Sequence, residues 1–303
     1  MILSPSIVNI LKSIKFKFMN MRLMKKESSI PTRMWIATIL ICQSSFLFGF
    51  ALSSLNACLV LGDKNKAAAC FNGDDDASPN CPPGTIYNDM LLSPFEASLA
   101  TSLTVIGAWI GCLSGSHPSE KYGRKKTLLY NNILFIGGAL VAASGNDIML
   151  YMGRFLIGLA VGITSTVAPC LIAEISSDSH RGTLTTMFQL ILTIGILTAS
   201  LLAYGLVTNV NHGWQYVQAC GAIPALVQLI FQSWIPESPK WILSKLNDRQ
   251  AAMDVLSDLR SEDDNVEVEI QQMQIAAEND ESPKSDGEST DVTWAGESCS
   301  NIV

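Results

Sequence analysis

Charged residues are scarce in this chain. Asp, Glu, Lys and Arg make up 16% of its 303 residues, whereas hydrophobic residues make up 48% and the mean hydropathy is positive. Water-soluble domains carry about 25% charged residues, so the composition is that of a membrane protein. The sequence contains no motif typical of a catalytic, cofactor-binding or metal-binding site. We therefore expect neither an enzyme nor a nucleic-acid partner. The sequence also has no Asn-x-Ser/Thr sequon, so we expect no N-glycosylation.

The negative charge that is present gathers at the end of the chain. The net charge is −7, yet residues 261–303 hold twelve acidic residues and one Lys, which leaves 19 basic and 15 acidic residues in the first 260. A segment rich in Ser, Glu and Asp buries too little apolar surface to offset its ordering entropy. We therefore expect residues 278–303 to form a disordered acidic tail that is unrelated to the membrane part.

Six segments are long and apolar enough to cross a bilayer, which takes about 20 helical residues. A soluble helical domain can hold one such segment in its core, but six in succession indicate a helical membrane protein. The expected spans are residues 35–61, 95–116, 128–147, 150–173, 184–207 and 214–235.

Lys and Arg lie in alternate loops, which sets the orientation. Residues 1–34 hold seven of them against one Glu, and EKYGRKK after the second span is also basic. The loop after the first span has two Lys against five Asp, and those after the third and fifth spans have no Lys or Arg. We therefore expect the N-terminus and the stretch after the sixth span to lie in the cytoplasm.

Two segments outside the spans raise separate questions. Residues 1–34 lack the basic start and the small-residue cleavage site of a signal peptide, so we expect a cytoplasmic extension. Alternative start residues are Met19, Met21 and Met24. In the outer loop, residues 62–94, Cys70 and Cys81 face an oxidising compartment where two cysteines can pair, and the sequence leaves that pairing open.

Small residues recur four apart in the second and fourth spans, at Gly107, Gly111 and Gly115 and at Gly158 and Gly162. Such spacing makes a groove along one helix face that lets a neighbouring backbone approach closely. Tightly packed bundles need this groove, and so do transporters whose helices tilt against each other. The pattern permits transport without identifying it.

Ionisable groups of both signs flank the inner ends of the spans. They are Arg124, Lys125, Glu174, Arg181 and Glu237. A further cation, Arg154, opens the fourth span, where a charge is costly and normally faces a partner or water. Glu174 can pair with Arg181 or with the basic loop around Arg124. Snorkelling at the interface explains any single residue, but the set favours a network that closes the inner face.

Polar side chains also occur within the spans. Gln189, Thr193 and Ile196 share one helical stripe of the fifth span. A Gln amide in an apolar helix needs hydrogen-bond partners, because leaving it unmet costs about 1–3 kcal/mol. A hydroxyl-rich solute in a central cavity supplies them, and so does a helix–helix hydrogen bond. Asn56 in the first span raises the same alternatives.

Four motifs occur in one order: EKYGRKK, then GRFLIGLAVGITSTVAPCLIAEISSDSHRG (153–182), QLILTIGIL and PESPKWIL (236–243). Together they resemble the sugar porter family of the major facilitator superfamily, over about residues 35–275. The resemblance implies an all-α membrane protein whose six transmembrane helices (35–235) form the N-terminal half of that fold. Short intracellular helices are then expected within residues 236–277, in a plasma-membrane protein with both termini cytoplasmic.

The resemblance also implies roles for individual residues. Arg124, Glu174, Arg181 and Glu237 match the inner-rim positions of the family, and Gln189 matches a sugar-contacting position. Asn56 matches an Asn of the glucose-facilitator branch more weakly. Proton-coupled members carry an Asp where this chain has Ala51, so facilitated diffusion is expected rather than proton symport.

The family has twelve spans with substrate held between two halves, and nothing here resembles the second half. Three interpretations stay open: a truncated gene product or splice form, a half that assembles with another copy or another half, and a membrane protein without transport activity. The predicted function is facilitative hexose transport by alternating access, as a truncated or half transporter. The alternative is a non-transporting interaction or regulatory protein.

Overall fold

The computed structural model describes residues 31–59, 84–90, 92–177, 179–260 and 266–281. The expected N-terminal extension up to residue 30, the Cys70 and Cys81 pair, and the tail beyond residue 281 lie outside these residues. Within the described part of the chain the regular elements are all helical, and no strand occurs.

Four helices are long and apolar enough to cross a membrane: α2 (Thr32–Leu59), α5 (Pro94–Tyr122), α7 (Asp147–Ile175) and α8 (Arg181–Asn209). The remaining two expected spans correspond to shorter helices: α6 (Arg124–Ala142), and the pair α9 (Gly213–Cys220) and α10 (Ala222–Ile230). The other elements of the described residues are α4 (Ile86–Met90), η1 (Gln232–Trp234), α11 (Pro239–Trp241), η2 (Ile242–Leu246), α12 (Arg249–Leu259) and α13 (Val266–Glu281).

Two expected spans differ from the helices observed. The third ends at Ala142 rather than at 147, because Gly145 adopts a φ of 78° and Asn146 Oδ1 then accepts the N–H of Ile148 at 3.0 Å to start α7. The sixth is divided at Gly221 into α9 and α10. Pro224 explains the division, since it has no N–H for the preceding turn and is tolerated only near a helix start.

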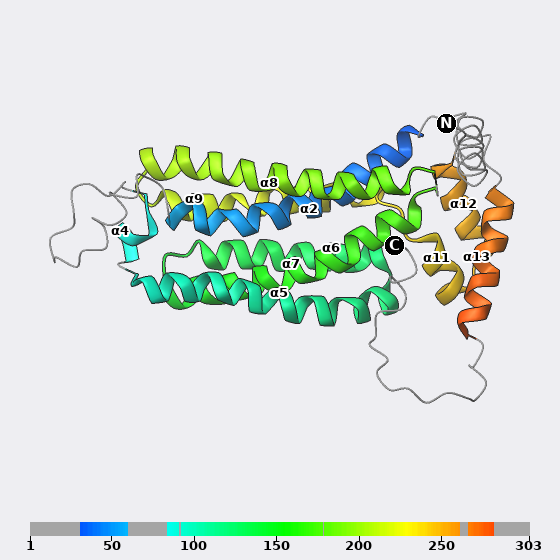
Figure 1. Ribbon diagram of the computed structural model, residues 1–303, viewed down its shortest axis with the longest axis horizontal. Coiled ribbons are helices and arrows are strands. Elements are labelled where there is room, and N and C mark those ends of the chain that lie inside the picture. Colours follow the sequence, from blue (N-terminus) through cyan, green and yellow to red (C-terminus); the bar gives the residue numbers. More distant parts are fainter. Residues whose placement is uncertain (1–30, 60–83, 91, 178, 261–265, 282–303) are drawn as a thin grey trace, which may run out of the picture.

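The long helices pack in pairs. α2 packs along α8, and α5 and α6 pack along α7. Figure 1 shows these helices running together along the long axis of the molecule, with α4 at one end and α11–α13 at the other. α5 and α8 are less covered than the helices they pack on: their most apolar windows are 28% buried, against 56% in α2 and α7.

The spaced glycines bring α5 and α7 into backbone contact. A methyl group at Gly158 would lie 2.3 Å from the carbonyl oxygen of Thr104, and one at Gly111 would lie 2.3 Å from that of Leu159. The close approach expected from the four-residue spacing is therefore present.

Candidate functional site

Arg124 and Glu174 form a two-bond ion pair at the end of the bundle that carries α11–α13. Arg124 Nε donates to Glu174 Oε2 and Nη2 donates to Oε1, each at 3.1 Å. Nη1 donates to the carbonyl oxygen of Ser119 at 3.3 Å. The two side chains are only 9% and 3% exposed. Because α6 begins at Arg124 and α7 ends one residue after Glu174, this pair ties the start of one helix to the end of another.

Glu237 is held at the same end by backbone amides. Its Oε1 accepts the N–H of Lys125 at 3.0 Å and that of Ser238 at 3.1 Å. Gly123, between α5 and α6, has a φ of 98°, and a methyl group there would lie 2.3 Å from Glu237 Oε2. Glycine at this position thus serves two needs: it adopts a backbone conformation that L side chains rarely adopt, and it leaves room for the carboxylate.

Arg181 completes this group. Its Nε donates to the carbonyl oxygen of Ala173 at 3.2 Å, one residue before Glu174. We call this set the inner-rim network: Arg124, Lys125, Glu174, Arg181 and Glu237. The structure brings these residues from four separate stretches of sequence to one end of the bundle.

The PESPKWIL segment joins the bundle to the short helices that follow. Ser238 Oγ accepts the N–H of Trp241 at 3.2 Å, and Pro239 occupies the first helical position of α11. Trp241 Nε1 donates to the carbonyl oxygen of Glu120 at 2.7 Å, which anchors α11 to the end of α5. Trp241 also packs in an apolar cluster with Leu256 of α12 and other residues of α12 and α13.

Arg260 makes contacts that the sequence alone did not predict. Its Nη1 donates to the carbonyl oxygen of Ile175 at 2.8 Å, and its Nε and Nη2 donate to the two carboxylate oxygens of Glu269 at 2.9 and 2.6 Å. The side chain is 1% exposed. It therefore ties the last turn of α7 to α12 and α13. No local pattern marks Arg260, because its main-chain partner lies 85 residues earlier in the sequence.

We expect Arg260→Met to loosen α12 and α13 from the bundle. The change keeps apolar bulk but removes three hydrogen bonds and leaves Glu269 without its partner, a local loss of about 2–3 kcal/mol. Hydrogen exchange should then rise across both helices. Arg33→Met is the control, since the ion pair of Arg33 with Asp258 has side chains 64% and 55% exposed and contributes about 0–1 kcal/mol. Equal exchange in the two variants would contradict the anchoring role.

The residues expected to contact a sugar lie on the surface of this chain. Gln189 and Thr193 are exposed on α8, Ile196 is half-buried, and Asn56 is exposed on α2. Thr193 Oγ1 donates to the carbonyl oxygen of Gln189 at 2.9 Å, and Asn56 Nδ2 donates to that of Leu52 at 3.4 Å. These hydrogen bonds stay within one helix, and the exposed Gln189 side chain lies on the surface of the bundle.

Asn56 lies at a different depth from the α8 stripe. The two helices run side by side, with Ser45 donating to the carbonyl oxygen of Phe188 and Ser53 Oγ 2.9 Å from Ser200 Oγ. Gln189 is therefore nearly level with Ser45, and Asn56 is eleven residues farther along α2, or about 16 Å at about 1.5 Å per residue. The structure groups Gln189, Thr193 and Ile196 and separates Asn56 from them.

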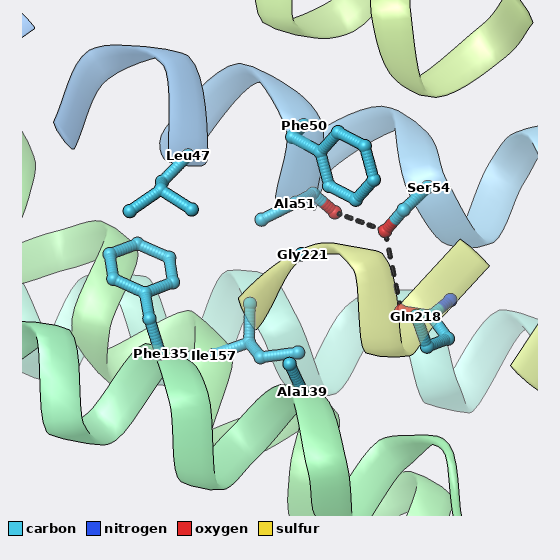
Figure 2. A pocket seen from close by; sticks show the side chains of 9 residues that line it. All are labelled: Leu47, Phe50, Ala51, Ser54, Phe135, Ala139, Ile157, Gln218 and Gly221. Atoms are coloured by element: carbon cyan, nitrogen blue, oxygen red, sulfur yellow. Dashed lines mark hydrogen bonds between the residues drawn. The ribbon is translucent and has the colours of Figure 1, made fainter. Parts of the chain in front are cut away.

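Arg154 is the centre of a buried polar cluster near the other end of the bundle. Its Nη2 donates to the carbonyl oxygen of Ala51 at 3.2 Å and its Nη1 to Ser54 Oγ at 3.4 Å, while Ser54 Oγ lies 3.4 Å from Gln218 Oε1. Figure 2 shows Ala51, Ser54 and Gln218 on one side of a small cavity whose other walls are apolar. The cluster joins α7 to α2 and α9.

The chain matches the family model described as "Sugar (and other) transporter" over residues 37–298. It is 30% identical over 274 residues to a facilitated glucose transporter homolog of Caenorhabditis elegans, covering 83% of this chain and 49% of that protein. It is 33% identical over 189 residues to the glucose transporter GlcP of Staphylococcus epidermidis, covering 62% of this chain and 42% of that protein.

The fold is similar to that of solved transporters. The proton:xylose symporter XylE, bound to 6-bromo-6-deoxy-D-glucose, superposes with a TM-score of 0.67 at 20% identity, covering 83% of this chain and 54% of that one. An inward-open form of XylE from E. coli superposes with a TM-score of 0.64. The chain thus spans about half the length of the relatives it matches.

Proposed function

The chain belongs to the sugar porter family of the major facilitator superfamily, and from that premise we propose that it forms one half of a facilitative hexose transporter. It is a multi-pass membrane protein. In the proposal it resides in the plasma membrane with both termini in the cytoplasm, and a second six-helix half closes the pathway. That half is another copy of this chain or a separate chain.

The exposed stripe of Gln189 and Thr193 on α8 carries the proposal. Both side chains sit on a membrane-length helix, where facing lipid leaves an amide unsatisfied at a cost of about 1–3 kcal/mol. A watery passage removes that cost, and a hexose hydroxyl can accept from and donate to the same amide. The inner-rim network supports alternating access, because its ion pair and its hydrogen bonds to the backbone can hold the cytoplasmic end in a closed arrangement.

Ala51 supports diffusion rather than proton coupling. Its carbonyl oxygen accepts a hydrogen bond from Arg154 Nη2 at 3.2 Å, and its side chain is a methyl group. A side chain that does not titrate cannot exchange a proton during the transport cycle, so the driving force is the gradient of the sugar.

Reconstitution in liposomes tests the proposal. We expect no saturable D-glucose uptake from this chain alone, and stereospecific uptake when it is co-reconstituted with the C-terminal half of a full-length relative. In that assembly Gln189→Ala should lower the specific uptake rate about tenfold, which is the loss of about 1.4 kcal/mol of hydrogen bonding to the sugar. Saturable uptake by the chain alone would contradict the half-transporter proposal.

A matched pair of threonines on α8 provides the control. Thr193 and Thr198 are both exposed, and each donates to the carbonyl oxygen four residues earlier, at 2.9 and 2.8 Å. Thr193 shares the stripe of Gln189, whereas Thr198 is turned about 140° from Thr193 around the helix. Thr193→Ala should reduce uptake and Thr198→Ala should not. Equal effects would contradict the assignment of this stripe to the pathway.

The second candidate function is a non-transporting membrane protein that binds a full-length relative. The same exposed stripe favours it, since a helix of another protein can also satisfy Gln189. Co-purification with a full-length transporter, together with the absence of uptake in every reconstituted assembly, would select this alternative.

A further inference from the structure

We propose that Arg154, Ser54 and Gln218 form a binding site for one small inorganic anion of the size of chloride. The site lies inside this six-helix half, apart from the α8 stripe and from the inner-rim network. Anion binding at this site does not require that the chain transport a sugar. The reasons are an uncompensated charge, an excess of hydrogen-bond donors and the small side chain at position 51.

The charge of Arg154 has no partner of opposite sign among the residues that the structure describes. The guanidinium is 2% exposed, and its contacts are the neutral oxygens of Ala51 and Ser54. The buried thiol of Cys58 is also near, but a thiol is a weak acceptor. A cation taken out of water without a counter-charge is strongly destabilising, so this position calls for an anion.

The cluster also has more donors than acceptors. Arg154 Nε and Gln218 Nε2 are buried N–H groups with no hydrogen-bond partner in the described part of the chain. Both belong to residues that contact the same atom, Ser54 Oγ. A group that accepts several N–H bonds and donates none, such as a halide, has the chemistry that such a donor-rich cluster needs. A second donor, such as an ammonium ion, would add to the excess.

Position 51 explains why the anion has to come from outside the chain. Ala51 of α2 accepts a hydrogen bond from Arg154 Nη2 through its carbonyl oxygen, and its side chain is a single methyl group. The adjoining cavity of about 10 Å³ is lined by Ala51, Ser54 and Gln218 together with apolar side chains (Figure 2). An Asp at position 51 would bring a carboxylate to this cluster from within the chain. Ala51 carries no charge, so in the proposal a bound anion from solution supplies the negative charge.

The test is the thermal stability of the full chain in detergent, measured in chloride against gluconate at equal ionic strength. Gluconate is too large for a buried site of this size. An anion that binds the folded chain raises its melting temperature in a saturable way, and we expect a rise of about 3–8 °C, with bromide acting like chloride. Equal melting temperatures in chloride and gluconate would overturn the proposal and indicate a water molecule or a rearranged cluster instead.

Two variants at position 51 separate a specific site from a general salt effect. Ala51→Asp supplies the charge from within the chain, so its stability in gluconate should rise and its response to chloride should disappear. Ala51→Asn adds similar bulk without charge, and its response to chloride should persist. If Ala51→Asp responds to chloride as strongly as the unchanged chain, the anion binds elsewhere and the proposal fails.

Discussion

Replacing Gly162 with alanine is expected to prevent the stable packing of α5 against α7. The added methyl group would lie 2.1 Å from the carbonyl oxygen of Ala108 and 2.6 Å from the amide nitrogen of Cys112. Both are backbone atoms of a long helix, so neither can rotate away as the end of a side chain can. Overpacking in a core costs about 1–3 kcal/mol where side chains give way, and a backbone clash of this size should cost about 3 kcal/mol or more.

Gly137 offers the matched control on α6. A methyl group there meets nothing within 4 Å, and alanine is the better helix former by about 1 kcal/mol. Gly137→Ala should therefore leave the melting temperature in detergent unchanged or slightly raised, whereas Gly162→Ala should yield aggregated or poorly folded protein on size-exclusion chromatography. Equal elution profiles and melting temperatures for the two variants would show that α5 and α7 do not approach as closely as Gly162 indicates.

The long helices were predictable because their signal is continuous along the chain. Uninterrupted apolar runs located α2, α5, α7 and α8 to within a few residues at most ends. The third and sixth spans were less predictable, because single residues decide where they end. The polar residues Ser144 to Asp147 marked a break after the third span, but the positive φ of Gly145 sets where α6 ends, and Pro224 divides a sixth span whose apolar run is continuous.

Contacts between distant stretches of sequence were harder to predict. The basic loop and the two carboxylates indicated a charged inner rim, but their pairing was open until the backbone placed Arg124 against Glu174 and the amides around Glu237. Gln228 Nε2 likewise donates to the carbonyl oxygen of Leu40 at 2.6 Å, across a sequence separation of 188 residues. Such bonds depend on which helices become neighbours, and periodicity along one helix carries no information about that.

Breaking the Arg124–Glu174 pair is the second change for which we expect a large effect. Glu174→Gln leaves the buried guanidinium of Arg124 without its counter-charge, and Arg124→Gln leaves the buried carboxylate of Glu174 without its own. Removing one member of a buried pair costs about 3–5 kcal/mol. The double variant Arg124→Gln/Glu174→Gln should be less destabilised than the sum of the single changes, because no uncompensated charge remains.

A cysteine beside the pair can report on the same change. Cys170 Sγ lies 3.6 Å from Glu174 Oε1 and is half-buried. With the other cysteines replaced by serine, its reaction with a maleimide should quicken in Glu174→Gln, because we expect this end of the bundle to open when its ion pair is lost. Glu120→Gln is the control, since that side chain is exposed at the same end, and the substitution keeps the backbone carbonyl that accepts from Trp241 Nε1. Equal labelling rates in the two variants would mean that the pair stabilises the fold without holding the inner end closed, and the inner-rim network would then lose its proposed role in alternating access.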